Sequence, residues 1–217
     1  DIEAVISVLK SDYLTQGPAV PAFEAAVSNK VNSRFAVAVN SATSALHIAC
    51  IAIGIKKNDR VWTTNTSFVA SANCAAYWDA KIAFLDIELD TYNINLGLLE
   101  KKLKATKKKF LPKVIIVVHM GGQPADMLKL FRLSKKYKFK IIEDASHALG
   151  SSIGSERIGS CRYSDICVFS FHPVKIITTG EGGMVLTNNE SFKESLNGGM
   201  QTDLIWEKDT LRIYNLH

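Results

Sequence analysis

The feature that most constrains the fold is an alternation of short apolar runs with helical patterns. Residues 114–118, Val-Ile-Ile-Val-Val, are apolar at every position. A strand that is apolar on both faces is typical of a parallel sheet, because helices cover both sides of such a sheet. The sequence therefore predicts an α/β fold, with a mostly parallel sheet and helices on both faces.

The expected elements alternate regularly along the chain. No helical pattern separates the last two expected strands, so we expect at least one antiparallel pairing there. Gly54 and Asp126 support two helix boundaries, as a C-terminal glycine and an N-cap. Strands are expected at residues 35–39, 61–64, 82–86, 114–118, 140–143, 166–171 and 184–187, and helices at about 42–53, 67–77, 96–103 and 126–137.

Charge and composition argue against several classes of protein. The net charge of +5 owes much to lysines within residues 101–109. No aromatic residues are interleaved with them, so a solvated helix face is favoured over a nucleic-acid site. The excess of positive charge would suit an anionic small substrate. The longest apolar strand run is too short to cross a bilayer, so no membrane partner is expected.

The cysteines indicate a reducing compartment. Cys50, Cys74, Cys161 and Cys167 lack Cys-x-x-Cys spacing and lie within or beside apolar runs. We therefore expect buried free thiols in the cytoplasm, with neither disulfides nor a metal site.

Two reactive side chains come at the ends of expected strands. Asp144 ends the strand at 140–143, and Lys175 lies just beyond the strand at 166–171. Ligands of open α/β sheets bind at the carboxyl ends of strands. An amine can hold an aldehyde cofactor, and a carboxylate can keep a pyridine nitrogen protonated so that the ring accepts electrons. The pair predicts pyridoxal 5'-phosphate, with Lys175 also acting as general acid and base.

Each residue also has a plainer interpretation. Lysines are usually exposed, and an acid at a strand end is often a helix cap. The setting argues against exposure of the lysine, because its neighbours are too apolar for a solvated loop: Phe169, Phe171, Ile176 and Ile177. His147, three residues after Asp144, would pack beside the ring or orient the carboxylate, although a structural role is the commoner one for a single histidine.

A third segment predicts a phosphate site. Residues 40–46, Asn-Ser-Ala-Thr-Ser-Ala-Leu, follow a strand and open a helix, where backbone amides and the helix dipole favour an anion. On this segment alone an ordinary serine N-cap is the better interpretation. The glycine-rich residues 178–183 would let the backbone turn close beside the cofactor.

Together these motifs resemble those of the DegT/DnrJ-type sugar aminotransferases, which are fold-type I pyridoxal-phosphate enzymes. The resemblance covers nearly the whole chain, and residues 143–150 and 170–183 are highly specific together. Residues 62–65, 67–74 and 171–175 look like the branch that aminates UDP-4-keto-6-deoxy-N-acetylhexosamines on the way to pseudaminic acid. The resemblance implies a UDP-ketosugar substrate, an amino-acid donor expected to be glutamate, and ping-pong kinetics.

The resemblance also implies a role for individual residues. Lys175 would be the Schiff-base lysine, Asp144 would pair with the pyridine nitrogen, and Phe68 would stack on the ring. His147 would lie near the phenolic oxygen, and Asn215 would reach the phosphate of a neighbouring subunit in a homodimer with active sites at the interface. The phosphate would be held by Ala42, Thr43 and Ser170.

Several departures from the family pattern bear on the site. Ser41-Ala42-Thr43 stands where the family commonly has Ser-Gly-Thr, and Thr178 stands where it commonly has glycine. Family members continue past His217 into a smaller C-terminal domain, so we expect residues 1–217 to form the cofactor-binding large domain of a longer chain. A catalytically silent fragment, acting only in dimerisation or cofactor binding, is the alternative. Lys175 argues against the sugar dehydratase branch, which has histidine at that position.

Overall fold

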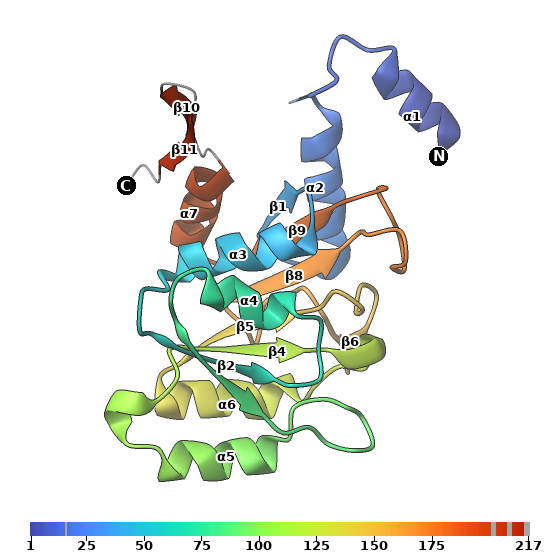
Figure 1. The fold of residues 1–217 in the computed structure, drawn as a ribbon. Coiled ribbons are helices and arrows are strands. Elements are labelled where there is room, and N and C mark those ends of the chain that lie inside the picture. The colour runs from blue at the N-terminus through green and yellow to red at the C-terminus, as the bar shows by residue number, and fades with distance from the viewer. Residues whose placement is uncertain (16, 201–202, 208–209, 215–217) are drawn as a thin grey trace.

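The fold is built on one seven-stranded sheet. The computed structural model describes residues 1–15, 17–200, 203–207 and 210–214. The strands lie in the order β1-β9-β8-β5-β4-β2-β3 (Figure 1). Every strand expected from the sequence is present, and no end differs by more than one residue. The strands are β1 Phe35–Val39, β2 Arg60–Thr64, β3 Lys81–Leu85, β4 Val114–Val118, β5 Lys140–Asp144, β8 Ile166–Ser170 and β9 Gly183–Thr187.

The sheet is parallel except for one strand. β2 pairs with β3 and β4, β4 with β5, and β5 with β8, all in parallel. β9 runs antiparallel to both β8 and β1. The antiparallel pairing expected from the sequence is therefore confirmed. It arises because residues 171–182 connect β8 to β9 as a turn without a helix, and a parallel pairing would need a long crossover.

Helices cover both faces of the sheet. α3 (Ala42–Ile53), α4 (Ala70–Ala76) and α7 (Glu190–Met200) lie on one face, and α5 (Leu96–Ala105) and α6 (Met127–Tyr137) on the other (Figure 1). α2 (Ala19–Val31) covers β8 and β9, and α1 (Ile2–Leu9) projects away from the sheet. The smaller elements are η1 Lys108–Phe110, η2 Met120–Gly122, β6 Ser152–Ile153, β7 Glu156–Arg157, β10 Asp203–Glu207 and β11 Thr210–Tyr214.

The sequence did not predict α1, α2 or α7. Pro21 interrupts the helical pattern of α2, but it lies in the first turn, where a missing backbone N–H breaks no helical hydrogen bond. The helix expected at 67–77 begins only at Ala70. Residues 65–69 form a non-helical turn instead, and this turn reaches the cavity described below.

The core follows the two-residue period of the strands. Ile116 and Ile142 pack under α3 and α4, whereas Ile115 and Ile141 pack against α5 and α6, and none is more than 1% exposed. Successive side chains of a strand point to opposite faces. Asp144, two residues beyond Ile142, therefore emerges on the α3 and α4 face.

Truncating a core leucine tests this packing. Leu130 on α6 is 0% exposed, so Leu130→Ala should lower the free energy of unfolding by about 2–5 kcal/mol through lost contacts and a residual cavity. Urea denaturation measures the change. Leu128→Ala, on the same helix but 39% exposed, is the control and should change the free energy of unfolding much less. Equal losses for the two variants would contradict the assignment of Leu130 to the core.

Candidate active site

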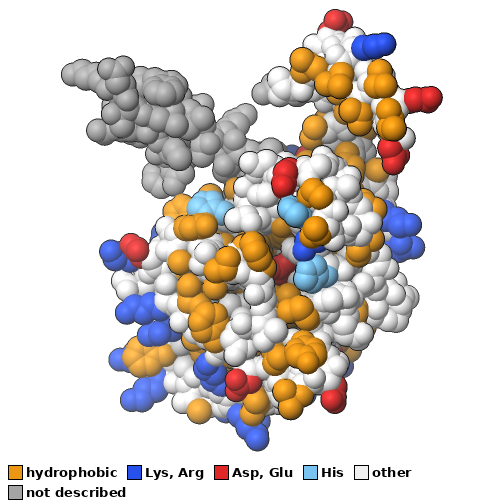
Figure 2. All heavy atoms as spheres, turned by 45° about the vertical axis from the view of Figure 1, so that its right-hand side comes forward, with side chains coloured by type: hydrophobic (Ala, Val, Ile, Leu, Met, Phe, Trp, Pro, Cys, Tyr) orange, Lys and Arg blue, Asp and Glu red, His pale blue; other side chains and the backbone are white. Residues whose placement is uncertain are grey.

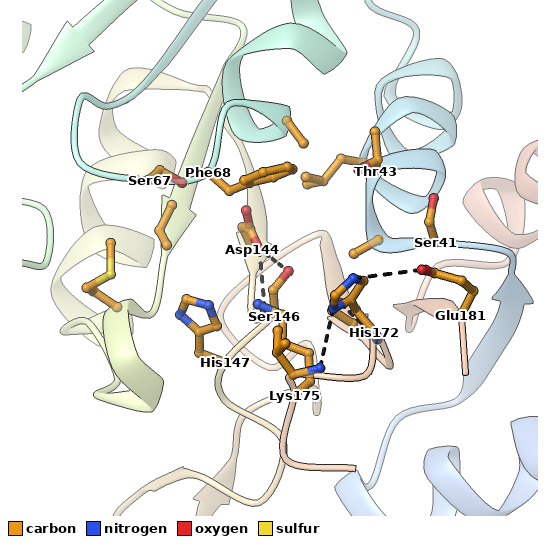
Figure 3. A pocket seen from close by; sticks show the side chains of 18 residues that line it. Ser41, Thr43, Ser67, Phe68, Asp144, Ser146, His147, His172, Lys175 and Glu181 are labelled. Atoms are coloured by element: carbon orange, nitrogen blue, oxygen red, sulfur yellow. Dashed lines mark hydrogen bonds and ion pairs between the residues drawn. The ribbon is translucent and has the colours of Figure 1, made fainter. Parts of the chain in front are cut away.

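One cavity of about 330 Å³ lies at the carboxyl ends of β4, β5 and β8, opposite the N-terminus of α3 (Figure 3). Small-molecule sites typically have volumes of roughly 300–1,000 Å³. Asn215, expected to reach a neighbouring subunit, lies outside the described residues. The other residues singled out from the sequence all line the cavity: Ala42, Thr43, Phe68, Asp144, His147, Ser170 and Lys175.

Asp144 is a buried carboxyl group held by hydroxyl groups. Its side chain is 4% exposed, and Ser71 donates its Oγ–H to Oδ2 at 2.5 Å. Ser146 donates its Oγ–H to Oδ1 at 2.6 Å and its backbone N–H to the same oxygen at 3.3 Å. No lysine, arginine or histidine forms an ion pair with it in the part of the chain that the structure describes. Because a buried charge without a counter-charge is costly, the cavity is suited to a cationic N–H donor at this point.

Two of these contacts come from serines to which the sequence analysis gave no such role. Ser71 and Ser146 hold the carboxylate by hydrogen bonds, whereas among the described residues His147 makes no hydrogen bond to it. His147 instead lines the cavity as a half-buried side chain. The sequence signal for Ser71 was the hydroxyl pair Ser67 and Ser71 within one of the segments that carry the family resemblance.

The N-terminus of α3 faces the cavity with free amides. Ser41 is extended and caps the helix, accepting the backbone N–H of Ser44 at 3.1 Å. The cap does not bond the backbone amides of Ala42 and Thr43. These amides have no acceptor within the helix, because they belong to its first turn. The serine-cap interpretation is therefore right for Ser41, and an anion site remains available beside it.

Gly183 allows this turn to lie against β9. A Cβ on Gly183 would lie 2.4 Å from the carbonyl carbon of Ser41 and 2.6 Å from the nitrogen of Ala42. Gly183 pairs with Val39 on β1 and with Ser170 on β8. The absence of a side chain thus brings the helix N-terminus close to Ser170.

Lys175 lies in the turn after β8. Its backbone N–H donates to the carbonyl of His172 at 2.9 Å, and its side chain is half-buried. Phe171, at the base of the turn, is 0% exposed and packs edge-on against Phe23. Ile176 and Ile177 are 61% and 46% exposed, so the expectation that these two help to bury the lysine is wrong. The turn is anchored at its base and open beyond Lys175.

The mouth of the cavity carries a second pair that the sequence analysis missed. His172 Nε2 lies 3.8 Å from Glu181 Oε1, and His172 Nδ1 accepts the backbone N–H of Val174 at 3.3 Å. Both side chains are well exposed. The pair lies between the lysine turn and the glycine-rich segment, where Gly182 also lines the cavity.

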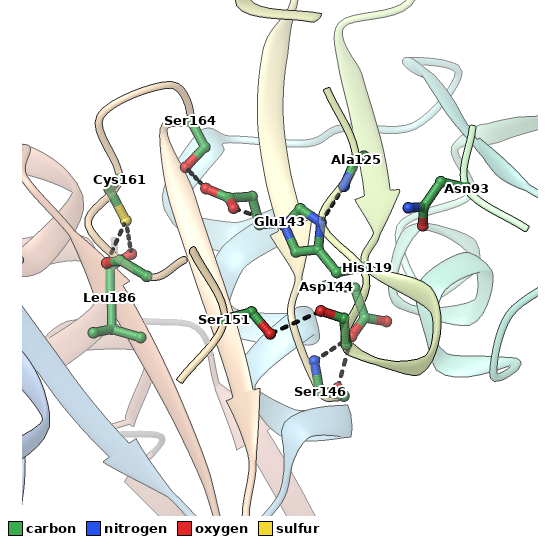
Figure 4. Close-up of polar contacts among 12 residues, drawn as sticks. Asn93, His119, Ala125, Glu143, Asp144, Ser146, Ser151, Cys161, Ser164 and Leu186 are labelled. Carbon is green, nitrogen blue, oxygen red and sulfur yellow. Dashed lines mark hydrogen bonds and ion pairs between the residues drawn. The ribbon is translucent and has the colours of Figure 1, made fainter. Parts of the chain in front are cut away.

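A closed polar network lies on the opposite face of β5 (Figure 4). His119 Nε2 lies 2.8 Å from Glu143 Oε2, and His119 Nδ1 accepts the backbone N–H of Ala125 at 3.1 Å. Nε2 therefore carries the ring proton and donates it to Glu143. Ser164 donates its hydroxyl to the other oxygen of Glu143. This network also fixes the end of β4 beside β5, since the backbone N–H of His119 donates to the backbone carbonyl of Asp144 at 3.2 Å.

Ionisation in the site is set by burial and charge. Burial lowers the pKa of His147, the positive charge of Lys175 lowers it further, and Asp144 partly opposes the shift. All four cysteines are free and buried, as expected. Burial raises the pKa of the Cys161 and Cys167 thiols, so these are structural rather than reactive groups. The described residues contain neither a helix that could span a membrane nor a group of metal ligands.

Comparison with known proteins gives a consistent match. The model of the DegT/DnrJ/EryC1/StrS aminotransferase family matches residues 1–201. The UDP-4-amino-4,6-dideoxy-N-acetyl-beta-L-altrosamine transaminase of Campylobacter jejuni (strain 81-176) is 41% identical over 99% of this chain and 57% of its own length.

Solved structures match over the same region. Helicobacter pylori PseC, an aminotransferase involved in the biosynthesis of pseudoaminic acid, has a TM-score of 0.84 at 31% identity and covers 98% of this chain and 56% of its own. NtdA from Bacillus subtilis with bound cofactor PMP has a TM-score of 0.81 at 28% identity and covers 90% of this chain and 42% of its own. The chain thus spans about half the length of the curated relatives it matches.

The pKa of His147 tests the electrostatics of the cavity. The midpoint of its NMR titration should lie below the ordinary value of about 6.5. Lys175→Ala removes a positive neighbour and should raise the midpoint, whereas Asp144→Asn removes a negative neighbour and should lower it further. Shifts of the same sign in the two variants would contradict this arrangement. Because the unfolded chain binds the proton more readily, His147 should also reduce stability as the pH falls through about 6.5.

Proposed function

The chain belongs to the DegT/DnrJ/EryC1/StrS aminotransferase family, and from that premise we propose that it carries the pyridoxal 5'-phosphate site of a nucleotide-sugar aminotransferase. One observation carries the proposal: a single cavity joins an amine, a buried carboxylate that forms no ion pair with any described residue, and an open helix N-terminus. These three features match the aldehyde, the protonated ring nitrogen and the phosphate of this cofactor.

Each lining residue has a proposed part in holding the cofactor. Asp144 would accept the ring N–H, Phe68 would cover a ring face, and Lys175 would hold the aldehyde carbon through Nζ. The phosphate would lie at the first amides of α3 and near the hydroxyl of Ser170, a site for which Gly183 leaves room. The full set for the phosphate is Ala42, Thr43 and Ser170.

The chemistry follows from the same side chains. The bound cofactor supplies an electron sink that stabilises a carbanion at the substrate carbon. Lys175 Nζ, when neutral, can take the proton from that carbon and return it. The Asp144 carboxylate would face the ring nitrogen and accept the hydrogen bond from its N–H. His147, neutral because burial lowers its pKa, can bond a phenolic oxygen without adding positive charge beside Lys175.

The proposed substrate is a UDP-linked 4-keto-6-deoxy-N-acetylhexosamine, with glutamate as amino donor. Support comes from the names of the Campylobacter transaminase and of PseC, both more than 30% identical to this chain. The net charge of +5 suits an anionic sugar nucleotide. The free, buried thiols support a cytoplasmic location.

We also propose a homodimer with active sites at its interface. Large apolar side chains are exposed around the cavity, and Figure 2 shows hydrophobic groups beside a hollow that holds histidine, acidic and lysine side chains. Such patches are typical of protein–protein contacts. Asn215 of the neighbouring subunit would then complete the phosphate site. The apolar side chains are Phe68, Val69, Val174, Ile176 and Ile177, between 46% and 77% exposed.

Replacing the lysine tests the proposed chemistry. The wild-type chain with added pyridoxal 5'-phosphate should develop a visible absorption band, and borohydride should fix the cofactor to it. Lys175→Ala should show neither, because the attaching amine is gone, while Lys138→Ala, an exposed lysine outside the cavity, should behave like the wild type. Addition of glutamate should remove the wild-type band. A band that glutamate leaves unchanged would favour the silent cofactor-binding module, and identical spectra for wild type and Lys175→Ala would refute the site.

A charged substitution among the exposed apolar side chains around the cavity tests the proposed dimer. Ile176→Asp should shift the chain toward monomer in sedimentation equilibrium, because a carboxylate would be buried at the interface. Leu128→Asp, on the far face of the sheet, should leave the association unchanged. A wild-type chain that is monomeric at all accessible concentrations would disprove the proposed dimer.

A further inference from the structure

We propose that Ser71 is a positioning residue, backed by Ser67, which aims the Asp144 carboxylate at the ring nitrogen of the cofactor. The inference rests on the proposed function, since it concerns the same cavity. Ser71 itself is 0% exposed and does not line the cavity, so it acts only through Asp144.

The hydroxyl groups form a chain with one direction. Ser71 Oγ lies 2.5 Å from Asp144 Oδ2 and 2.7 Å from Ser67 Oγ. An ionised carboxylate only accepts, so the single proton of Ser71 goes to Asp144. Ser67 must then donate to Ser71. The chain therefore runs from Ser67 at the cavity wall through Ser71 to the carboxylate, and each step polarises the next.

The number of acceptor sites on Asp144 shows why these two serine hydroxyls matter for binding the cofactor ring. A carboxylate offers about four lone-pair sites. Ser71 uses one of them, and the hydroxyl and backbone N–H of Ser146 use two more. About one site then remains, on a side chain that is otherwise enclosed. The three donors thus leave a single acceptor position for the ring N–H.

The location of Ser71 distinguishes it from an ordinary helix serine. Serines within helices commonly bond a carbonyl of the preceding turn. Ser134 on α6 does so, because its Oγ donates to the carbonyl of Phe131 at 2.8 Å. Ser71, near the start of α4, instead donates to a side chain 73 residues away on β5. Ser134 is for this reason a matched control: a buried helix hydroxyl without a role in the cavity.

The same short segment also carries the ring-stacking candidate. Phe68 lies between Ser67 and Ser71 in sequence, and its carbonyl accepts the backbone N–H of Ser71 at 3.1 Å. The segment 67–71 would therefore hold the ring face and, through Asp144, the ring edge. A shift of this segment would therefore change both the stacking of Phe68 on the ring and the position of Asp144 at the ring edge.

The test uses 4'-deoxypyridoxine 5'-phosphate, which has the ring nitrogen and phosphate but no aldehyde, so its binding does not need Lys175. Calorimetry should show roughly tenfold weaker binding to Ser71→Ala, since a hydrogen bond to a charged group is lost. Ser67→Ala should weaken binding about two- to threefold, because only the outer link is removed. Ser134→Ala should bind like the wild type, and Asp144→Asn should bind least.

A second measurement separates positioning from simple loss of structure. With the analogue labelled at the ring nitrogen, the ¹⁵N shift in Ser71→Ala should move toward the unprotonated form, because a carboxylate with fewer donors competes better for the proton. Thermal unfolding identifies a variant that has merely lost its fold, and Ser67→Ala, half-buried at the cavity wall, then carries the test.

The outcomes are distinct. Wild-type affinity and ¹⁵N shift in both serine variants, with weak binding by Asp144→Asn, would overturn the role of Ser71 and leave the proposed function intact. If the wild type bound no pyridine phosphate, the proposed function would fail and this inference with it. Graded losses in affinity together with the ¹⁵N change would establish the positioning role.

Discussion

The interaction on which the site depends is the enclosure of one carboxylate, Asp144, at the carboxyl edge of the sheet, where it forms no ion pair with any residue that the structure describes. Asp144 is almost fully buried, and its described donors are neutral hydroxyl and amide groups. Neutral donors stabilise a buried carboxylate only in part, and no described residue forms an ion pair with this one. The cavity therefore favours a ligand that brings a cationic N–H. That requirement explains the proposed roles of Lys175, the N-terminus of α3 and the turn at 67–71 in binding the ligand.

Two adjacent acids on β5 show how strand geometry separates structure from function. Glu143 points away from the cavity and is enclosed by His119 and Ser164, so its oxygens are satisfied within the protein. Asp144 points into the cavity and keeps an acceptor position free. The hydrogen bonds around Glu143 fix the strand ends, whereas Asp144 faces the proposed ligand. A period of two residues suffices to give two neighbouring carboxylates opposite roles.

The residues around the opening of the cavity also bear on its function. Phe171 anchors the lysine turn in the core, while Ile176 and Ile177 remain exposed beyond it. Exposed apolar groups beside a polar hollow are costly in water, and in the proposed homodimer a second copy of the chain would cover them. The half-buried state of Lys175 thus belongs to a site whose wall is in part open. In the proposed dimer, closing that wall would also exclude water from the reacting carbon.

The sequence by itself determined the strands and the edge of the sheet where the reactive residues gather. Apolar periodicity is local, and parallel strands end together, so Asp144 and Lys175 could be assigned to one crevice from the sequence, whereas Ser170 was assigned there only through the family resemblance. Only the tertiary structure decided which groups hold the carboxylate. Ser71 and Asp144 are 73 residues apart, and their contact depends on how α4 packs beside α3 on this face of the sheet. It also depends on the turn at 65–69, which the sequence analysis had predicted to be part of the helix. The exposure of Ile176 and Ile177 was likewise decided by packing, because an apolar side chain is buried only where another surface meets it.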